Sequence, residues 1–243
     1  MSDAKVSPLI SMIDTFARHA PISSEDRTAL LELPFALRLV DAGSYLVREG
    51  NTPDHCAMLV SGLACRHKIS GQGFRQIVSV HVPGDVIDLQ QLYLETADHN
   101  VQTLNQCMVV RVPREALRQL AADRLGIAQA IVATVLVELA IAREWILNIG
   151  RRDARTRIAH FLCELAVRLD MPGLPPGQPF ELPMTQEQLG DALGLTAVHI
   201  NRMFMGLVRD GLITRCKHSI TIPSWERLVQ AAGFNSRYLK LNG

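Results

Sequence analysis

The stretch TQEQLGDALGLTAVHINRMFMGLVRDGLI, residues 185–213, has the spacing of two short helices joined by a tight turn. Thr185 and Gln188 are three residues apart, the spacing of a capping box that begins a helix. Gly194 accepts the positive φ needed to leave that helix sharply, and Thr196 can cap the next helix. Apolar residues at helical spacing would form the inward face of the second helix: Ile200, Met203, Phe204 and Leu207. The pattern predicts a helix-turn-helix.

The outward face of the second helix carries residue types that contact DNA. Arg202 can donate to guanine or to a phosphate, and His199 and Asn201 can hydrogen-bond base edges or backbone. Small apolar side chains at the start of the helix can touch a thymine methyl. The alternative is an ordinary helical hairpin with a solvated polar face. The residues expected at the DNA in this segment are Thr185, Gln186, Thr196, Ala197, Val198, His199, Asn201 and Arg202.

A strand–turn–strand pattern follows at residues 211–222, GLITRCKHSITI. The turn lacks the usual glycine, and it brings Arg215, Lys217 and His218 to the tip of the hairpin, where phosphate contacts would need positive charge. Residues 180–184 can supply another short strand. Together these segments predict a winged helix.

Length and composition agree with two domains in a soluble α+β protein. The chain has 243 residues, of which 48% are hydrophobic and 20% charged, and its net charge is +1. We expect one domain at 1–150, which includes the long helix described below, and a DNA-binding domain at 151–243. Basic residues outnumber acidic ones in 151–243 and the reverse holds in 1–150, which supports DNA binding by the second domain.

A very apolar run, residues 125–142, is nearly long enough to span a membrane. It contains Gln129, Thr134 and Glu138, and a buried charge would be costly in lipid. We therefore predict no membrane span, but a long soluble helix over about residues 124–148.

The apolar positions of this helix repeat at three- and four-residue steps, which is typical of a two-helix coiled coil. Such a seam would be buried against a second copy of the same helix. The alternative is a helix packed into its own domain. Both interpretations hold if one face of the helix packs into its own domain and another face packs against the second copy. The expected seam consists of Ile131, Val135, Ala142, Ile146 and Ile149.

Short alternating or apolar runs separated by glycines fill residues 37–113 and predict a β-sandwich or jelly roll. One of the expected strands covers residues 101–112. Ahead of this region, residues 8–33 predict two short helices, with Ser24 as a cap. The N-terminus lacks a long apolar stretch, so we expect no signal peptide. The five cysteines form no CxxC pair, which favours reduced thiols in the cytoplasm.

The order of β-roll, long helix and winged helix resembles the Crp/Fnr family of bacterial transcription regulators. The resemblance lies in AGSYLVREGNTPDHCAMLVSGLACRHK (42–68), VPGDVIDL (82–89), RRDARTRIAHFL (151–162) and TQEQLGDALGLTAVHINR (185–202). It implies a jelly-roll sensor domain, a coiled-coil dimerisation helix and a C-terminal winged helix-turn-helix. It also implies a homodimer on near-palindromic double-stranded DNA. RNA polymerase is a further partner that the family suggests.

The residues that would bind a signal molecule differ from those of the family's cyclic-AMP receptors. Cyclic-AMP receptors carry a Gly-Glu-Leu element where this chain has Asp88 and Leu89. They also carry an Arg-Ser pair near the position at which this chain has residues 98–100, Asp-His-Asn. A cyclic phosphate would therefore meet carboxylates and no fixed cation, so cyclic AMP is not expected. We expect another small-molecule effector or none. The candidate effector pocket consists of Asp88, Leu89, Gln90, His99 and Asn100.

No metal or cofactor is predicted. The family's oxygen sensors hold an iron–sulfur cluster on closely spaced N-terminal cysteines, whereas the first cysteine here is Cys56 in the β-region. Haem stays open, because Cys65 and His67 share one face of an expected strand and His81 and His99 lie in the same domain. A redox-sensing thiol among the β-region cysteines also stays open.

Two other classes of function compete with a regulator. A jelly roll can carry a cupin-like metal-binding enzyme, but the histidines show no HxH or HxxxH spacing, so we expect no enzyme. A dimeric interaction module without DNA binding is the third class. Family members that read the TGTGA-type half-site present Arg and Glu where this chain has Ala197 and Val198. We therefore expect a different operator.

Overall fold

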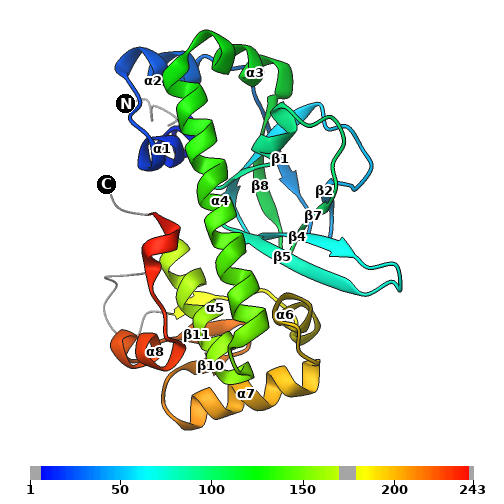
Figure 1. The fold of residues 1–243 in the computed structure, drawn as a ribbon, viewed down its shortest axis with the longest axis vertical. Coiled ribbons are helices and arrows are strands. Elements are labelled where there is room, and N and C mark those ends of the chain that lie inside the picture. Colours follow the sequence, from blue (N-terminus) through cyan, green and yellow to red (C-terminus); the bar gives the residue numbers. More distant parts are fainter. Residues whose placement is uncertain (1–6, 170–178, 241–243) are drawn as a thin grey trace, which may run out of the picture. The chain divides into compact units, whose positions relative to one another are not determined.

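The computed structural model describes residues 7–169 and 179–240 of the chain (Figure 1). The chain divides into two compact units. The first unit takes its residues from Met1–His67, Val80–Ala140 and Leu239–Gly243, and the second takes Lys68–Ser79 and Ile141–Tyr238. The expected combination of a β-roll, a long helix and a winged helix-turn-helix is confirmed. The division falls within the long helix, whereas the domain boundary proposed from the sequence lies at its end.

Two antiparallel sheets of four strands each form the β-roll (Figure 1). The first sheet has the order β1-β8-β3-β6, with β1 at Ala36–Val40, β8 at Cys107–Pro113, β3 at His55–Ser61 and β6 at Val86–Ile87. The second has the order β2-β7-β4-β5, with β2 at Tyr45–Val47, β7 at Asn100–Thr103, β4 at Ala64–Ile69 and β5 at Arg75–His81. The single strand expected over 101–112 was wrong, because β7 and β8 belong to different sheets.

Two helices precede the strands, and two more elements accompany them. These are α1 (Ile10–His19), α2 (Ser24–Leu31), the short 3-10 helix η1 (Leu89–Leu92) and α3 (Arg114–Asp123). The two expected N-terminal helices are confirmed. The cap of α2 is Ser23 rather than Ser24, because the Ser23 hydroxyl accepts a hydrogen bond from the backbone N–H of Asp26 at 3.0 Å. Ser24 is instead the first helical residue.

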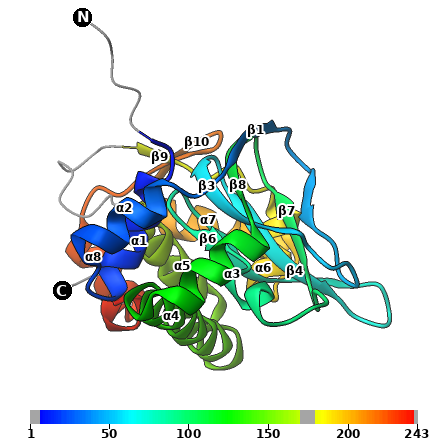
Figure 2. The same cartoon turned by 90° about the horizontal axis from the view of Figure 1, so that it is seen from above.

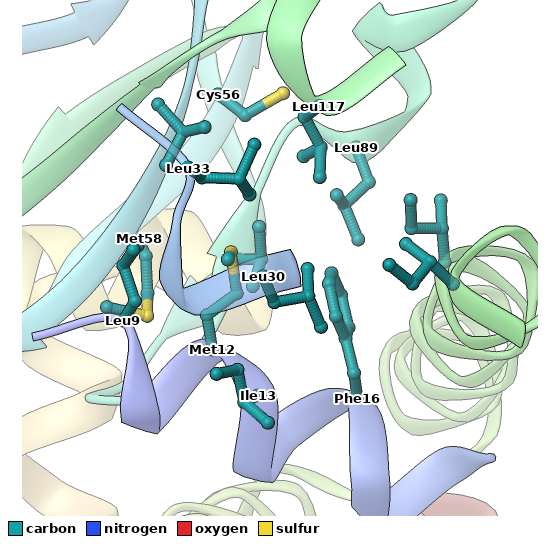
Figure 3. Packing of buried hydrophobic residues seen from close by; sticks show 14 of the residues in the cluster. Leu9, Met12, Ile13, Phe16, Leu30, Leu33, Cys56, Met58, Leu89 and Leu117 are labelled. Carbon is teal, nitrogen blue, oxygen red and sulfur yellow. The ribbon is translucent and has the colours of Figure 1, made fainter. Parts of the chain in front are cut away.

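Strand β3 divides its side chains between two hydrophobic cores, because successive residues of a strand point to opposite faces. Ala57 and Leu59 pack between the two sheets, whereas Cys56 and Met58 face the helices. The helical side of the sheet is covered by α1, α2 and α3 together with the start of the long helix (Figure 2). Figure 3 shows this core closely, including Phe16 of α1, which is fully buried.

The long helix α4 extends from Leu125 to Arg151. Of the helices that the structure describes, it is the one long and apolar enough to cross a membrane. Its first half instead buries Ile127, Ala130 and Ile131 in the core beside the β-roll. Ile131 is 2% exposed, so its place in the expected dimer seam was wrong: it lies on the face that packs into its own unit.

The second unit contains the end of α4, a three-stranded sheet of order β10-β11-β9, and the helices around it. The Trp145 indole N–H of α4 donates to the buried Glu164 carboxylate of α5 at 2.8 Å, which ties these two helices together. The elements are α5 (Ala154–Arg168), β9 (Pro179–Glu181), α6 (Gln186–Leu193), α7 (Ala197–Arg209), β10 (Thr214–Cys216), β11 (Ser219–Thr221), α8 (Trp225–Ala232) and the 3-10 helix η2 (Ser236–Leu239).

The turn between α6 and α7 has the expected chemistry. Thr185 and Gln188 form the reciprocal capping box, and the Thr196 hydroxyl accepts from the backbone N–H of His199 at 3.2 Å. Gly194 adopts a left-handed conformation with φ of 64°. Gly190 is required for another reason: a Cβ at this position would lie 2.4 Å from the carbonyl oxygen of Leu195.

We predict that Gly190→Ala destabilises the chain by about 1–3 kcal/mol, because the added methyl group would push the turn away from α6. Gly206→Ala is the matched control, since Gly206 lies inside α7 and a Cβ there meets nothing within 4 Å. The control should be neutral or stabilise by up to about 1 kcal/mol, because alanine favours a helix. Urea unfolding of both full-length variants measures the difference. Equal effects at the two positions would contradict the tight crossing.

Candidate nucleic-acid interface and effector site

The outward face of α7 is exposed, while Ile200, Phe204 and Leu207 anchor its other face in the core. Five of the predicted DNA-contacting residues are accessible here: Thr196, Ala197, Val198, Asn201 and Arg202 are exposed, and His199 is half-buried. Val198 is 81% exposed, an unusual state for a valine in a folded protein. Met205, one turn beyond Arg202, is 62% exposed. It was not among the residues predicted to contact DNA, although it lies seven residues after Val198 on the same face.

A hydrogen bond orients one of the polar side chains on this face. The amide nitrogen of Gln186, at the start of α6, donates to the side-chain oxygen of Asn201 at 3.3 Å. The N–H groups of the Asn201 amide take no part in this bond. They can therefore donate to an acceptor such as guanine O6 or N7, or thymine O4. Thr185 is exposed but its hydroxyl already caps α6.

The wing is the hairpin of β10 and β11, as expected, and its turn places Lys217 at φ of 55° in the position usually taken by glycine. Lys217 and His218 are exposed at the tip. Arg215 differs, because its Nε donates to the carbonyl of Lys217 at 3.1 Å and its guanidinium lies 4.9 Å from the Phe204 ring centre. Arg215 therefore holds the wing against α7 in addition to carrying charge.

Arg157 of α5 is a structural residue of this interface that the sequence did not single out. Its guanidinium donates to the carbonyl of Leu193, at the end of α6, at 2.5 Å. It also donates to the carbonyl of Ile149, near the end of α4, at 2.8 Å and to that of Arg152, the residue after α4, at 3.0 Å. The last carbonyls of a helix lack partners within the helix and attract cations. One side chain thereby connects α4, α5 and the helix-turn-helix.

The candidate effector residues of the β-roll lie around a buried guanidinium. Arg66 of β4 donates to the carboxylate of Asp88 at 2.9 Å, and its other terminal nitrogen lies 3.3 Å from Glu138 of α4. The same Asp88 oxygen lies 2.8 Å from His99 Nε2, and His99 Nδ1 lies 2.7 Å from Asp98. We call Arg66, Asp88, Asp98, His99 and Glu138 the Arg66 cluster.

Three of the five predicted pocket residues come together here, and two do not. Gln90 joins Asp88 and His99 by donating to the Asp88 carboxylate at 3.2 Å. Leu89 is 1% exposed and packs in the hydrophobic core, so its assignment to a pocket was wrong. The Asn100 side chain accepts from the backbone N–H of Glu49 and holds a loop in place.

The expectation that this region lacks a fixed cation was also wrong. Arg66 precedes Asp88 by 22 positions in the chain, so no local motif indicates that the two meet. The pairing of β4 with β7 places Arg66 opposite Val101 and so close to His99. Asp88 reaches the same point from the turn after β6, a strand of the other sheet. This cation is already engaged by two carboxylates of the chain itself.

Mutual interactions shift the pKa values of Asp88 and His99 in opposite directions. Burial opposes ionisation of Asp88, but the hydrogen bond from His99 and the charge of Arg66 hold its pKa below the ordinary value. Burial likewise opposes protonation of His99, but the hydrogen bond and the charge of Asp88 raise its pKa. With a carboxylate at each ring nitrogen, His99 is suited to carry both protons.

The cysteines and histidines that the structure describes do not fit an iron–sulfur cluster or another metal centre. Cys56 and Cys107 lie in different cores, on opposite faces of the same sheet. Burial raises the pKa of Cys56 to about 12 and that of Cys107 to about 11, which opposes formation of the thiolates that bind metal or react with oxidants. Within residues 7–169 and 179–240, no group of three or more His, Cys, Asp or Glu residues could hold a metal ion.

We predict that His99→Gln lowers the free energy of unfolding by about 1–3 kcal/mol below pH 6.5, because it removes a buried charged hydrogen bond. A histidine with a raised folded-state pKa stabilises fully below its ordinary value of 6.5 and loses that contribution as pH rises through the raised value. The difference between parent and variant should therefore shrink above that pH.

Urea unfolding over a pH series measures this difference. His218→Gln is the control, because His218 is exposed on the wing and its removal should leave the profile unchanged. An equal pH dependence of the parent and His99→Gln would rule out the charged pair.

Comparisons with known proteins agree with this architecture. Residues 156–231 match the family described as a Crp-like helix-turn-helix domain, and residues 37–124 match the cyclic nucleotide-binding domain. The chain is 31% identical over 222 residues to the transcriptional activator protein FnrL of Cereibacter sphaeroides, covering 89% of this chain and 88% of that protein. The fumarate and nitrate reduction regulatory protein of Vibrio cholerae is 27% identical over 194 residues, covering 80% of this chain and 77% of that protein.

The structure of FixK2 from Bradyrhizobium japonicum superimposes with a TM-score of 0.75 at 26% identity, covering 82% of this chain and 98% of that chain. These similarities confirm the resemblance drawn from the sequence motifs and exclude the cupin-like enzyme. They also support DNA binding over an interaction module without it, because a Crp-like helix-turn-helix domain matches and the relatives are named transcriptional activators. The chain belongs to the Crp/Fnr family and is a DNA-binding transcription regulator.

Proposed function

We propose that the chain is a cytoplasmic homodimer that reads a near-palindromic operator with one α7 helix from each subunit. The observation that carries this proposal is the exposed face of α7, anchored from behind and flanked by a basic wing. Two such helices can enter successive major grooves about 34 Å apart on one side of the DNA. RNA polymerase is the further partner proposed, which the name of the relative FnrL, a transcriptional activator, supports.

The dimer seam that we propose is a regular heptad repeat on α4. Leu125, Val132, Leu139 and Ile146 are seven residues apart and are 50–73% exposed, a large apolar strip for one subunit. The intervening seam positions are Val135, Ala142 and Ile149, which are half-buried. Four of the five residues expected from the sequence thus stay in the proposed seam: Val135, Ala142, Ile146 and Ile149.

We predict that Leu139→Glu converts the dimer into monomers, because it places two like charges in the centre of an apolar seam. The affinity for the operator should also fall, because a monomer contacts a single half-site and makes half of the contacts of the dimer. Leu94→Glu is the matched control, because Leu94 is 57% exposed and lies in the loop after η1, outside the heptad repeat of α4. Analytical ultracentrifugation gives the mass of each variant. A dimeric Leu139→Glu chain would refute the seam.

The operator is proposed to differ from the TGTGA-type half-site. Ala197 and Val198 cannot hydrogen-bond base edges, so Asn201 and Arg202 remain as the exposed polar readers on α7, with His199 beside them. Thymine methyl groups are the base feature that alanine and valine contact best. A half-site with thymine opposite the start of α7 and guanine opposite Arg202 would suit this face.

Selection of bound sequences from random DNA tests the proposed function directly. The parent should yield an inverted repeat that is not of the TGTGA type. We predict that Arg202→Ala weakens binding by about 1–3 kcal/mol and relaxes the preference at one base pair of each half-site. Lys217→Ala on the wing is the control, expected to weaken binding to all sequences alike and to reduce the salt dependence. Uniform weakening by Arg202→Ala would show that Arg202 contacts phosphate only, and no sequence selection by the parent would refute the function.

A further inference from the structure

The Arg66 cluster joins four separate elements of the first unit. Arg66 comes from β4, Asp88 from the turn after β6, His99 from the residue before β7, and Glu138 from α4. Asp88 is 1% exposed, and the Arg66 side chain is 14% exposed. Ion pairs withdrawn from water in this way are screened little, so breaking one side leaves a costly unpaired charge.

Asp88 contacts the guanidinium from an uncommon backbone conformation. Asp88 has φ of 65°, a left-handed conformation that glycine adopts freely and other residues rarely do. A glycine here would relieve the backbone and lose the carboxylate. The chain carries the strained residue, and its side chain accepts from Arg66, His99 and Gln90 with a single oxygen.

A partly buried arginine guanidinium with no partner on its own chain would be a binding point for a carboxylate or phosphate from solution. In this chain a carboxylate on the same polypeptide already binds it. The arrangement is also not saturated: the second oxygen of Asp88 and the Nε of Arg66 are buried with no hydrogen-bond partner among the described residues.

We propose that Asp88 is a built-in ligand of the β-roll, whose carboxylate binds Arg66 in place of an anionic effector. Through Arg66 it fixes Glu138, the residue beside the seam position Leu139, and so holds α4 in register with the β-roll without a small molecule. This inference rests on the proposed function as an operator-binding dimer. The regulator is then competent to bind DNA when no anionic metabolite is present.

The experiment is chemical rescue with the full-length chain on its selected operator. Asp88→Gly removes the carboxylate and suits the local backbone, so a loss of function cannot come from backbone strain. We expect operator affinity to fall about tenfold, within the range of typical allosteric couplings. Millimolar formate should restore the affinity of Asp88→Gly, with chloride at equal ionic strength as the salt control. The parent should respond neither to formate nor to cyclic AMP.

Two further variants complete the test. Asp26→Asn breaks the Asp26–Arg124 pair of 3.1 Å, another ion pair within the first unit, and should bind the operator like the parent. Glu138→Gln should lower the affinity without formate rescue. It keeps the test decisive if Asp88→Gly does not fold, because Glu138 is 26% exposed and tolerates the change.

Full affinity of Asp88→Gly without formate, or full affinity of Glu138→Gln, would overturn the proposal. A folded, dimeric Asp88→Gly chain that formate cannot rescue would also overturn it, as would a parent that gains affinity on addition of cyclic AMP. A parent that selects no operator would instead refute the proposed function, so the two failures are distinguishable.

Discussion

Burial of both faces of the β3–β8 strand pair is the constraint on which the first unit depends. Alternate residues of β3 and β8 enter two different cores, so the sheet must be covered on each side. The second sheet covers one face, and α1, α2, α3 and the first half of α4 cover the other. A strand pair of this kind leaves no solvent-facing side that could tolerate the loss of either cover.

This constraint divides the surface of α4. One face of its first half is required for the core, as the buried Ile127 and Ile131 show, and the heptad positions on another face are left exposed. A helix with two apolar faces is explained when each face has a partner. The length and hydropathy of α4 would be sufficient for a membrane span, but its inner face packs on protein.

Burial also determines which partners the charged residues of the β-roll need. In a low-dielectric interior, the guanidinium of Arg66 needs carboxylate partners, and the chain supplies them from Asp88 and Glu138. In the second unit, Arg157 plays a comparable role by binding the terminal carbonyls of α4 and α6. Both arginines connect elements that hydrophobic contact alone would leave free to slide, because dispersion forces have little directionality and charged hydrogen bonds have much.

Local chemistry was readable from the sequence because it depends on neighbours in the chain. The capping box at Thr185 and Gln188, the left-handed Gly194, the cap at Thr196 and the hairpin wing all follow from residues within a few positions of one another. The tertiary structure alone decided which apolar face of α4 is buried, which made Ile131 a core residue rather than a seam residue. It alone brought Arg66 to Asp88, because the packing of one sheet against the other, and not sequence distance, sets which charges meet there.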